Sequence, residues 1–341
     1  MKNVSLLLGV LMAVMSGVAA SAQSRVGTGT ASSVEASLND REGPAISPGD
    51  AEVYYRTGSR LLELGRYNEA IEAFWKAIKV KPDSPLIHND LGYSYFLGGN
   101  YIQAVAAYQE AIRLQPNYAL AYNNLGTAYL HLKDYENAYL FLRKALLLKP
   151  DYANARYHLG VAYYASGRTS DAAECFQQAL QLNPKHTEAR ISLGCAYIDL
   201  GRFTEAIAVL RETLAINPQL QVAERNLGNA YFKAGKLREA MHAFQRALEL
   251  NPDDAEVHNN LGVAYNQLRT FKPAVSAYKR AIELAPAYAE AHYNLAIAYL
   301  GLNDRRSALE EYALLRDLKA DQAQTLYKAL YAGRIVEVSH K

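Results

Sequence analysis

The chain has few of the features that mark an enzyme or a nucleic-acid-binding protein. Its 36 basic and 34 acidic residues leave a net charge of +2, and it has no long run of lysine or arginine. This charge pattern does not indicate a surface for nucleic acid or for an anionic membrane. Outside the repeated positions described below, the sequence has no glycine-rich phosphate loop, no Ser, His and Asp in the order of a catalytic triad, and no carboxylate pair. We therefore predict that the protein is not an enzyme and has no metal or cofactor site.

Cysteine is scarce, and Cys175 and Cys195 are the only two residues of this type. In an oxidising compartment an even number of cysteines suggests a disulfide. We expect Cys175 on one helix and Cys195 on the inner face of a following one, so their separation stays open. Two free and packed thiols are the preferred interpretation.

Residues 1–22 contain a long apolar run. Lys2 provides a positive start, the residues from Val4 to Val18 are apolar or small, and the small residues before Ala22 suit a signal peptidase. We predict an export signal cleaved after Ala22, which would make the mature protein periplasmic or secreted, from a bacterium, and without a membrane span. The alternative is an uncleaved anchor, because the uncharged run is just long enough to span a bilayer.

Residues 23–50 are polar and rich in Ser, Gly, Thr and Ala, with no helical or strand periodicity. A segment of this composition cannot bury enough apolar surface to offset the entropy lost on ordering. We predict a disordered leader.

A unit of 34 residues recurs from residue 51 onward. The copy from Pro85 to Tyr118 reads PLIHNDLGYSYFLGGNYIQAVAAYQEAIRLQPNY and contains two helical patterns joined by a Gly-Gly-Asn turn. Gly99 is suited to end the first helix in a left-handed conformation, and Pro116 prevents the second helix from continuing. The two helices share an apolar seam that a single hairpin cannot bury alone.

Four positions of the unit return at fixed spacing. The first helix has a glycine followed three residues later by a tyrosine, the second helix has an alanine, and a proline closes the unit. The alanine is present in every copy from Ala70 to Ala308, and the proline in every copy from Pro82 to Pro286. The glycine returns as Gly58, Gly92, Gly126, Gly160, Gly194, Gly228 and Gly262, with Ala296 in the last copy.

This period and order of residues resemble the tetratricopeptide repeat, and the chain is identified as a member of that family on eight copies over residues 51–322. The resemblance implies an all-α fold, a right-handed superhelical α-solenoid of helix–turn–helix repeats. Residues 323–341 would form a capping helix, with helical pattern over residues 323–332, and a tail. Such a cap covers the apolar end of the last repeat.

In this family the first helices line a concave groove, and the resemblance places repeat positions two, five, six, nine, twelve and thirteen on it. These positions are rich in Asn and Tyr here, and Asn amides match the donors and acceptors of an extended peptide backbone. The row resembles the asparagine ladder in the repeat domain of O-GlcNAc transferase. The alternative is that these asparagines bond one helix to the next. The predicted peptide-binding residues are Asn89, Asn123, Asn124, Asn226, Asn229, Asn259, Asn260, Asn294, Arg225, Tyr93 and Tyr157.

The sequence does not support two more specific kinds of site, a carboxylate clamp and a metal site. Arg225, Asn229 and Asn260 are similar in kind to part of the clamp with which some family members hold a chaperone carboxylate. Glu290 occupies a position where the clamp needs a cation, and it would repel a carboxylate. We therefore predict only that Arg225 anchors an acidic group. Histidines on adjacent repeats, His258 and His292, are assigned to packing because no carboxylate or cysteine pattern accompanies them.

The resemblance implies a non-catalytic protein–protein interaction scaffold that binds extended protein or peptide segments in the concave groove. Two alternatives remain open. One is an envelope-complex assembly factor that docks through its convex face or its ends. The other is a regulatory or substrate-recruiting partner of a glycosyltransferase-type enzyme.

Overall fold

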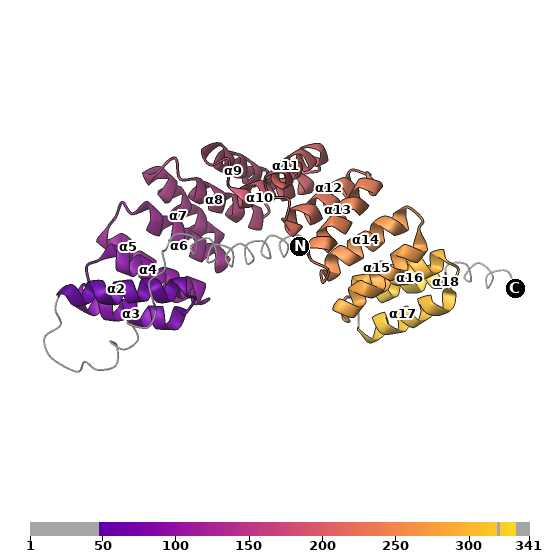
Figure 1. The fold of residues 1–341 in the computed structure, drawn as a ribbon, viewed down its shortest axis with the longest axis horizontal. Coiled ribbons are helices and arrows are strands. Elements are labelled where there is room, and N and C mark those ends of the chain that lie inside the picture. Colours follow the sequence, from indigo (N-terminus) through magenta and orange to yellow (C-terminus); the bar gives the residue numbers. More distant parts are fainter. Residues whose placement is uncertain (1–47, 319–320, 332–341) are drawn as a thin grey trace. The chain divides into compact units, whose positions relative to one another are not determined.

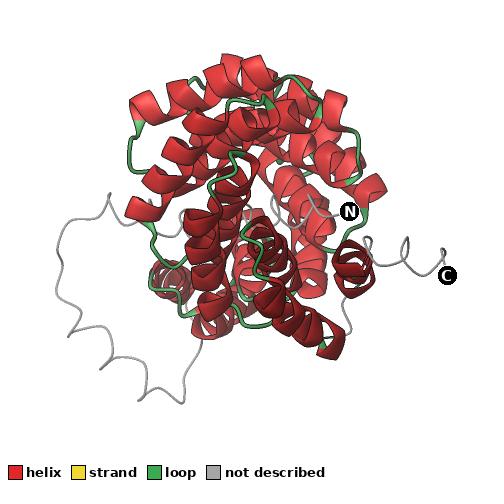
Figure 2. Cartoon of the chain, turned by 90° about the vertical axis from the view of Figure 1, so that its right-hand side faces the viewer, coloured by secondary structure: helices red, strands yellow, loops and turns green. Residues whose placement is uncertain are grey.

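The computed structural model describes residues 48–318 and 321–331, and every regular element in these ranges is a helix (Figure 2). The predicted all-α fold is confirmed. The predicted export signal and all but the end of the predicted leader lie outside the described residues, as do residues 332–341 of the predicted tail.

The helices alternate as first and second helices of successive repeats. The first helices are α2 (Pro48–Glu63), α4 (Pro85–Leu97), α6 (Ala119–His131), α8 (Ala153–Ala165), α10 (Thr187–Asp199), α12 (Gln221–Lys233), α14 (Ala255–Gln267) and α16 (Ala289–Gly301). The second helices are α3 (Tyr67–Val80), α5 (Tyr101–Leu114), α7 (Tyr135–Leu148), α9 (Thr169–Leu182), α11 (Phe203–Ile216), α13 (Leu237–Leu250), α15 (Phe271–Leu284) and α17 (Arg305–Asp317). A last helix, α18 (Gln322–Tyr331), follows them.

These helices form two compact units that divide inside α10, after Ser192. In unit 1 each helix from α2 to α9 contacts the next one along the chain, and α4 also contacts the first helices before and after it (Figure 1). Unit 2 follows the same scheme from α11 to α17. Successive first helices therefore lie next to one another within each unit, and their side chains can build a site that spans several repeats.

Small residues set the distance between the two helices of a repeat. A Cβ atom added at Gly92 would lie 2.7 Å from the ring of Tyr108, and one at Gly160 would lie 2.7 Å from the ring of Phe176. The recurrent alanine of the second helix is fully buried in every repeat. Gly99, with φ of +78°, ends the turn after α4 in the left-handed region, where a glycine avoids the clash of a Cβ atom.

The two ends of the array differ slightly from the sequence prediction. Helix α2 begins at Pro48, so residues 48–50 of the predicted leader are helical. A proline suits this place because the first turn of a helix does not need its N–H. At the other end, Leu326 and Leu330 of α18 pack against the buried Leu315 of α17. Helix α18 thus covers apolar side chains of the last repeat.

No helix in the described ranges is long and apolar enough to cross a membrane.

Candidate functional site

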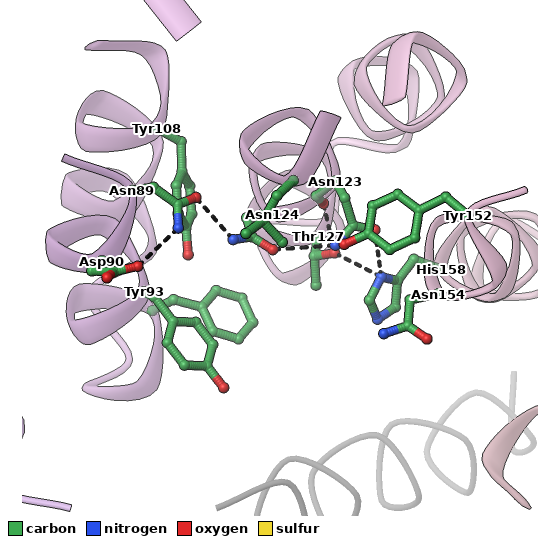
Figure 3. Close-up of a pocket in the computed structure, with 12 residues that line it drawn as sticks. Asn89, Asp90, Tyr93, Tyr108, Asn123, Asn124, Thr127, Tyr152, Asn154 and His158 are labelled. Carbon is green, nitrogen blue, oxygen red and sulfur yellow. Dashed lines mark hydrogen bonds between the residues drawn. The ribbon is translucent and has the colours of Figure 1, made fainter. Parts of the chain in front are cut away.

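A pocket of about 300 Å³ opens in unit 1 between α4, α5, α6 and α8 (Figure 3). Its apolar and aromatic wall consists of Tyr93, Phe96, Tyr108, Leu120 and Tyr152. Its polar wall consists of Asn89, Asp90, Asn123, Asn124, Thr127, Asn154 and His158. Most of these side chains come from the first helices of three successive repeats, which the fold brings together at this point.

One recurring contact builds the polar wall. The sixth residue of a repeat forms a hydrogen bond with the fifth residue of the preceding repeat. In unit 1 this contact joins Tyr55 Oη to Asp90 Oδ2 at 2.9 Å, Asn124 Nδ2 to Asn89 Oδ1 at 3.1 Å, and His158 Nδ1 to Asn123 Oδ1 at 2.9 Å. In unit 2 it joins Asn294 Nδ2 to Asn259 Oδ1 at 3.0 Å. The contact ties neighbouring first helices together.

Asp90 sets the direction of this network. An ionised carboxylate can only accept, so Asn89 donates its Nδ2 to Asp90 at 3.0 Å and turns its Oδ1 toward Asn124. Asn124 donates to that oxygen and accepts from Nδ2 of Asn123 at 3.2 Å. The Oδ1 of Asn123 then faces His158, whose Nδ1 must carry the proton. All these hydrogen bonds run from His158 toward Asp90 (Figure 3).

His158 is neutral at physiological pH. Burial lowers the pKa of its imidazole to about 3, and the nearby imidazoles of His186 and His131 act in the same direction. A neutral imidazole with the proton on Nδ1 leaves Nε2 as an acceptor. The polar wall therefore contains no positive charge at this end.

Asp90 is the only charged group among the twelve residues that line the pocket. Burial raises the pKa values of the lining tyrosines above their usual range, so they stay protonated. Burial also raises the pKa of Asp90, and the hydrogen bonds from Tyr55 and Asn89 oppose this effect. The pocket thus combines aromatic walls, amides and a single carboxylate.

Four of the asparagines predicted to bind a peptide do not lie on an open surface. Asn89, Asn123, Asn226 and Asn259 are at most 4% exposed. Three of them take part in the contacts between first helices described above, and Asn226 Nδ2 lies 3.2 Å from Cys195 Sγ. Buried amides need hydrogen-bond partners, and the neighbouring helix provides them. These amides therefore connect neighbouring repeats, which is the alternative that the sequence left open, and their binding to a peptide stays a prediction.

Tyr157 and Arg225 also have partners within the chain. Tyr157 is 4% exposed, and its ring packs near those of Phe176 and His186, at centroid distances of 5.7 and 4.8 Å. Arg225 Nη1 lies 3.7 Å from Asp254 Oδ2 and 3.4 Å from Glu256 Oε2. Arg225 is therefore paired within the chain, with Asp254 at the end of its own repeat and with Glu256 at the start of the next.

The remaining predicted residues are partly accessible. Asn124 and Tyr93 line the pocket of unit 1. In unit 2, Asn260 Nδ2 donates to Asn229 Oδ1 at 3.3 Å, and Asn294 is half-buried. The structure brings Tyr93 and Asn124 together in one site and leaves the unit 2 asparagines in contacts between repeats.

Sequence reasoning did not select Asp90, Asn154 or His158. A signal for two of them was present, because the sixth position is Asn in four repeats but Asp90 and His158 in repeats two and four. Asp90 and His158 occupy this position in the repeats before and after that of Asn124, and all three residues line the pocket. Their proximity depends on the packing of first helices from three repeats.

The histidines at the fourth repeat position stabilise turns. Each donates its Nε2–H to the carbonyl of the proline that closes the preceding repeat, over 2.8 to 3.0 Å, in the pairs His88–Pro82, His258–Pro252 and His292–Pro286. In the described part of the chain, no group of three or more His, Cys, Asp or Glu residues is placed to hold a metal ion.

Both cysteines are free and buried. Burial raises the pKa of the Cys175 thiol to about 11 and that of Cys195 to about 12. Thiols with such pKa values are protonated and inert at neutral pH. They pack as small apolar side chains, as the sequence analysis preferred.

Two family profiles match the chain. The profile described as Cilia and flagella-associated protein 70 C-terminal domain matches residues 11–230, which is more than half of the chain. The profile of the TPR repeat matches residues 228–268 and 271–303. The chain belongs to the tetratricopeptide-repeat family. Proteins of this family are typically non-catalytic scaffolds, and the match supports a general role of the present chain in protein–protein interaction.

Solved structures with the same fold come from several sources. A chain of the APC/C hetero-tetramer Cut9–Hcn1 has a TM-score of 0.58 and 19% identity, over 82% of this chain and 55% of that one. A tetratricopeptide repeat protein from Parabacteroides merdae has a TM-score of 0.56 and 18% identity, over 73% and 99%. Pseudomonas aeruginosa PilF has a TM-score of 0.54 and 23% identity, over 62% and 96%. At these identities the likeness concerns the fold alone. No curated protein sequence matches the chain.

Proposed function

We propose that this tetratricopeptide-repeat protein is a non-catalytic scaffold that holds an extended segment of another protein across the first helices of unit 1. One side chain of that segment would enter the pocket between α4, α5, α6 and α8. The observation that carries this proposal is the pocket itself, which has aromatic walls and a few converging polar groups. A concave site of this composition is typical of ligand recognition.

Polar groups around the pocket have hydrogen-bonding capacity to spare. Asn154 is exposed, and its amide makes no hydrogen bond within the described residues. Asn124 uses one N–H and one lone pair of its amide, which leaves one of each for a ligand. A peptide main chain in extended conformation offers alternating C=O and N–H groups that match these two amides.

Photo-crosslinking tests which face binds a partner. A photoreactive phenylalanine analogue at Tyr93, in the pocket, should cross-link to one short segment of a partner in the cells that make the protein. The matched control is the same analogue at Ile102, which is 72% exposed on α5. Cross-links from Ile102 alone would contradict the proposal and favour an assembly factor that docks through the second helices.

We also propose that the scaffold works outside the cytoplasm. The support is the charge and apolar pattern of residues 1–22 and the small residues before Ala22. The protein recovered from the periplasm or the medium should begin at Gln23 when its N-terminus is sequenced. A protein that retains Met1 in the membrane fraction would indicate an uncleaved anchor instead.

A further inference from the structure

We propose that the pocket of unit 1 selects a lysine or arginine side chain of the bound segment. Asp90 would be its counter-ion, with Tyr93 and Phe96 as aromatic walls. This inference rests on the proposed function, because it specifies which residue of the partner the pocket accepts.

Asp90 is a carboxylate that forms no ion pair with a cation of the described residues. Its two oxygens accept hydrogen bonds from Tyr55 at 2.9 Å and from Asn89 at 3.0 Å, and both donors are neutral. Within the described ranges no lysine or arginine lies at ion-pair distance from it. Asp90 is half-buried, and the partial loss of hydration raises its pKa because it disfavours the charged form unless a cation compensates it. A cation supplied by a partner would provide the missing compensation.

The fold does not require a charge at this position. Asn124 and Asn294 occupy the same repeat position and bond to the preceding repeat as neutral amides, donating where Asp90 accepts. Asp90 therefore carries a charge that the contact between repeats does not need. An ionisable group that lies in a pocket and has a shifted pKa is typical of a binding residue.

No positive charge inside the pocket competes for Asp90. The ionisable groups that line the pocket or interact with Asp90 are tyrosines with raised pKa values and the neutral His158. They come from α2, α4, α5, α8 and the turns before α6 and α8, and they are Tyr55, Tyr93, Tyr108, Tyr118, Tyr152 and His158. At neutral pH the pocket thus carries one negative charge, that of Asp90, and it would repel an acidic side chain.

The aromatic side chains add to the attraction for a cation. Tyr93 is three residues after Asp90 on α4, so the two side chains share one face of the helix (Figure 3). Phe96 lies three residues further along and also lines the pocket. The negative face of an aromatic ring attracts ammonium and guanidinium groups. Both basic side chains have an apolar stem that can contact the same rings.

The variant Asp90→Asn removes the charge and preserves the network. The new amide can accept from Asn89 through its Oδ1, and the hydroxyl of Tyr55 can rotate to accept from its Nδ2. We expect this variant to fold and to resist urea at least as well as the wild type. Asp151→Asn is the matched control, because it removes the same charge from an exposed turn between α7 and α8.

Random 12-residue peptides displayed on phage can be selected on the full chain and on both variants. The wild type and Asp151→Asn should enrich peptides with a lysine or arginine at one shared position, and Asp90→Asn should not. Wild-type peptides without such a basic position would overturn the inference and leave the proposed function intact. Enrichment of no peptide by any of the three proteins would contradict both.

A double-mutant cycle then tests the pairing directly. Replacing the shared basic residue of a selected peptide by norleucine should weaken its binding to the wild type at least about tenfold, as desolvated charge pairs do. The same replacement should have little effect on binding to Asp90→Asn. An equal loss of affinity on both proteins would show that Asp90 is not the counter-ion. Exchange of lysine and arginine in the peptide identifies the preferred cation.

Discussion

Replacing Gly160 with valine should destabilise unit 1 by about 3 kcal/mol, at the upper end of what overpacking costs. A Cβ atom at this position would lie 2.7 Å from Cε1 of Phe176 and 3.1 Å from Cβ of Cys175. Phe176 is fully buried, so its ring has no room to move away. The added side chain must therefore force α8 and α9 apart.

Urea unfolding followed by circular dichroism measures this effect. Neighbouring repeats stabilise one another, so the transition should separate into two steps around the disrupted repeat. Ala165→Val is the control, because it adds the same β-branched side chain to a partly exposed position of α8. A single transition at the wild-type midpoint for Gly160→Val would refute the packing role of the glycine.

Acid should destabilise unit 1 through two half-buried histidines. Burial lowers the pKa of His131 to about 4 and, with nearby histidines, that of His158 to about 3. Because the unfolded chain takes up these protons near pH 6.5 and the folded chain does not, stability is lost as the pH falls below that value. Each histidine should account for a loss of about 2 kcal/mol between about pH 7 and pH 5.

The variant His158→Asn isolates this contribution. Asn is the residue that four other repeats place at the same position, so the bond to Asn123 can be retained. The stability difference between wild type and variant, measured in urea, should change by about 2 kcal/mol in favour of the variant between pH 7 and pH 5. Asp90 has a raised pKa and acts in the opposite direction, but it is common to both proteins. Parallel pH profiles would show that His158 does not titrate as proposed.

The repeats could be predicted from the sequence because their determinants are local and periodic. Gly92 and Ala104 had to be small for two helices to approach closely, and the structure places Tyr108 directly against Gly92. Gly99 was expected to end the first helix, and its φ of +78° agrees with this role. The same small and turn-forming residues return every 34 residues. Each of them alone is weak evidence, but together they indicate one fold.

The candidate site could be predicted only in part. The sequence placed Asn89 and Asn124 on the first helices and left open whether they bind a peptide or the neighbouring helix. Whether an amide binds a partner or the next helix depends on the distance between neighbouring first helices, which sequence spacing does not contain. Asp90 was not selected because the sequence does not show what surrounds it, whereas the structure shows that none of the described lysines or arginines pairs with it.

The sequence by itself thus determined the family, the helix–turn–helix repeat and the positions that pack, because these follow from residue types at a fixed period. Tertiary structure alone decided which polar residues are available. It buried Asn123 and Asn226 between helices, and it paired Arg225 with Asp254 and Glu256. It left Asp90 in a pocket with neutral neighbours. The physical reason is that burial and hydrogen-bond partners depend on the contacts between repeats, which arise only when the repeats stack.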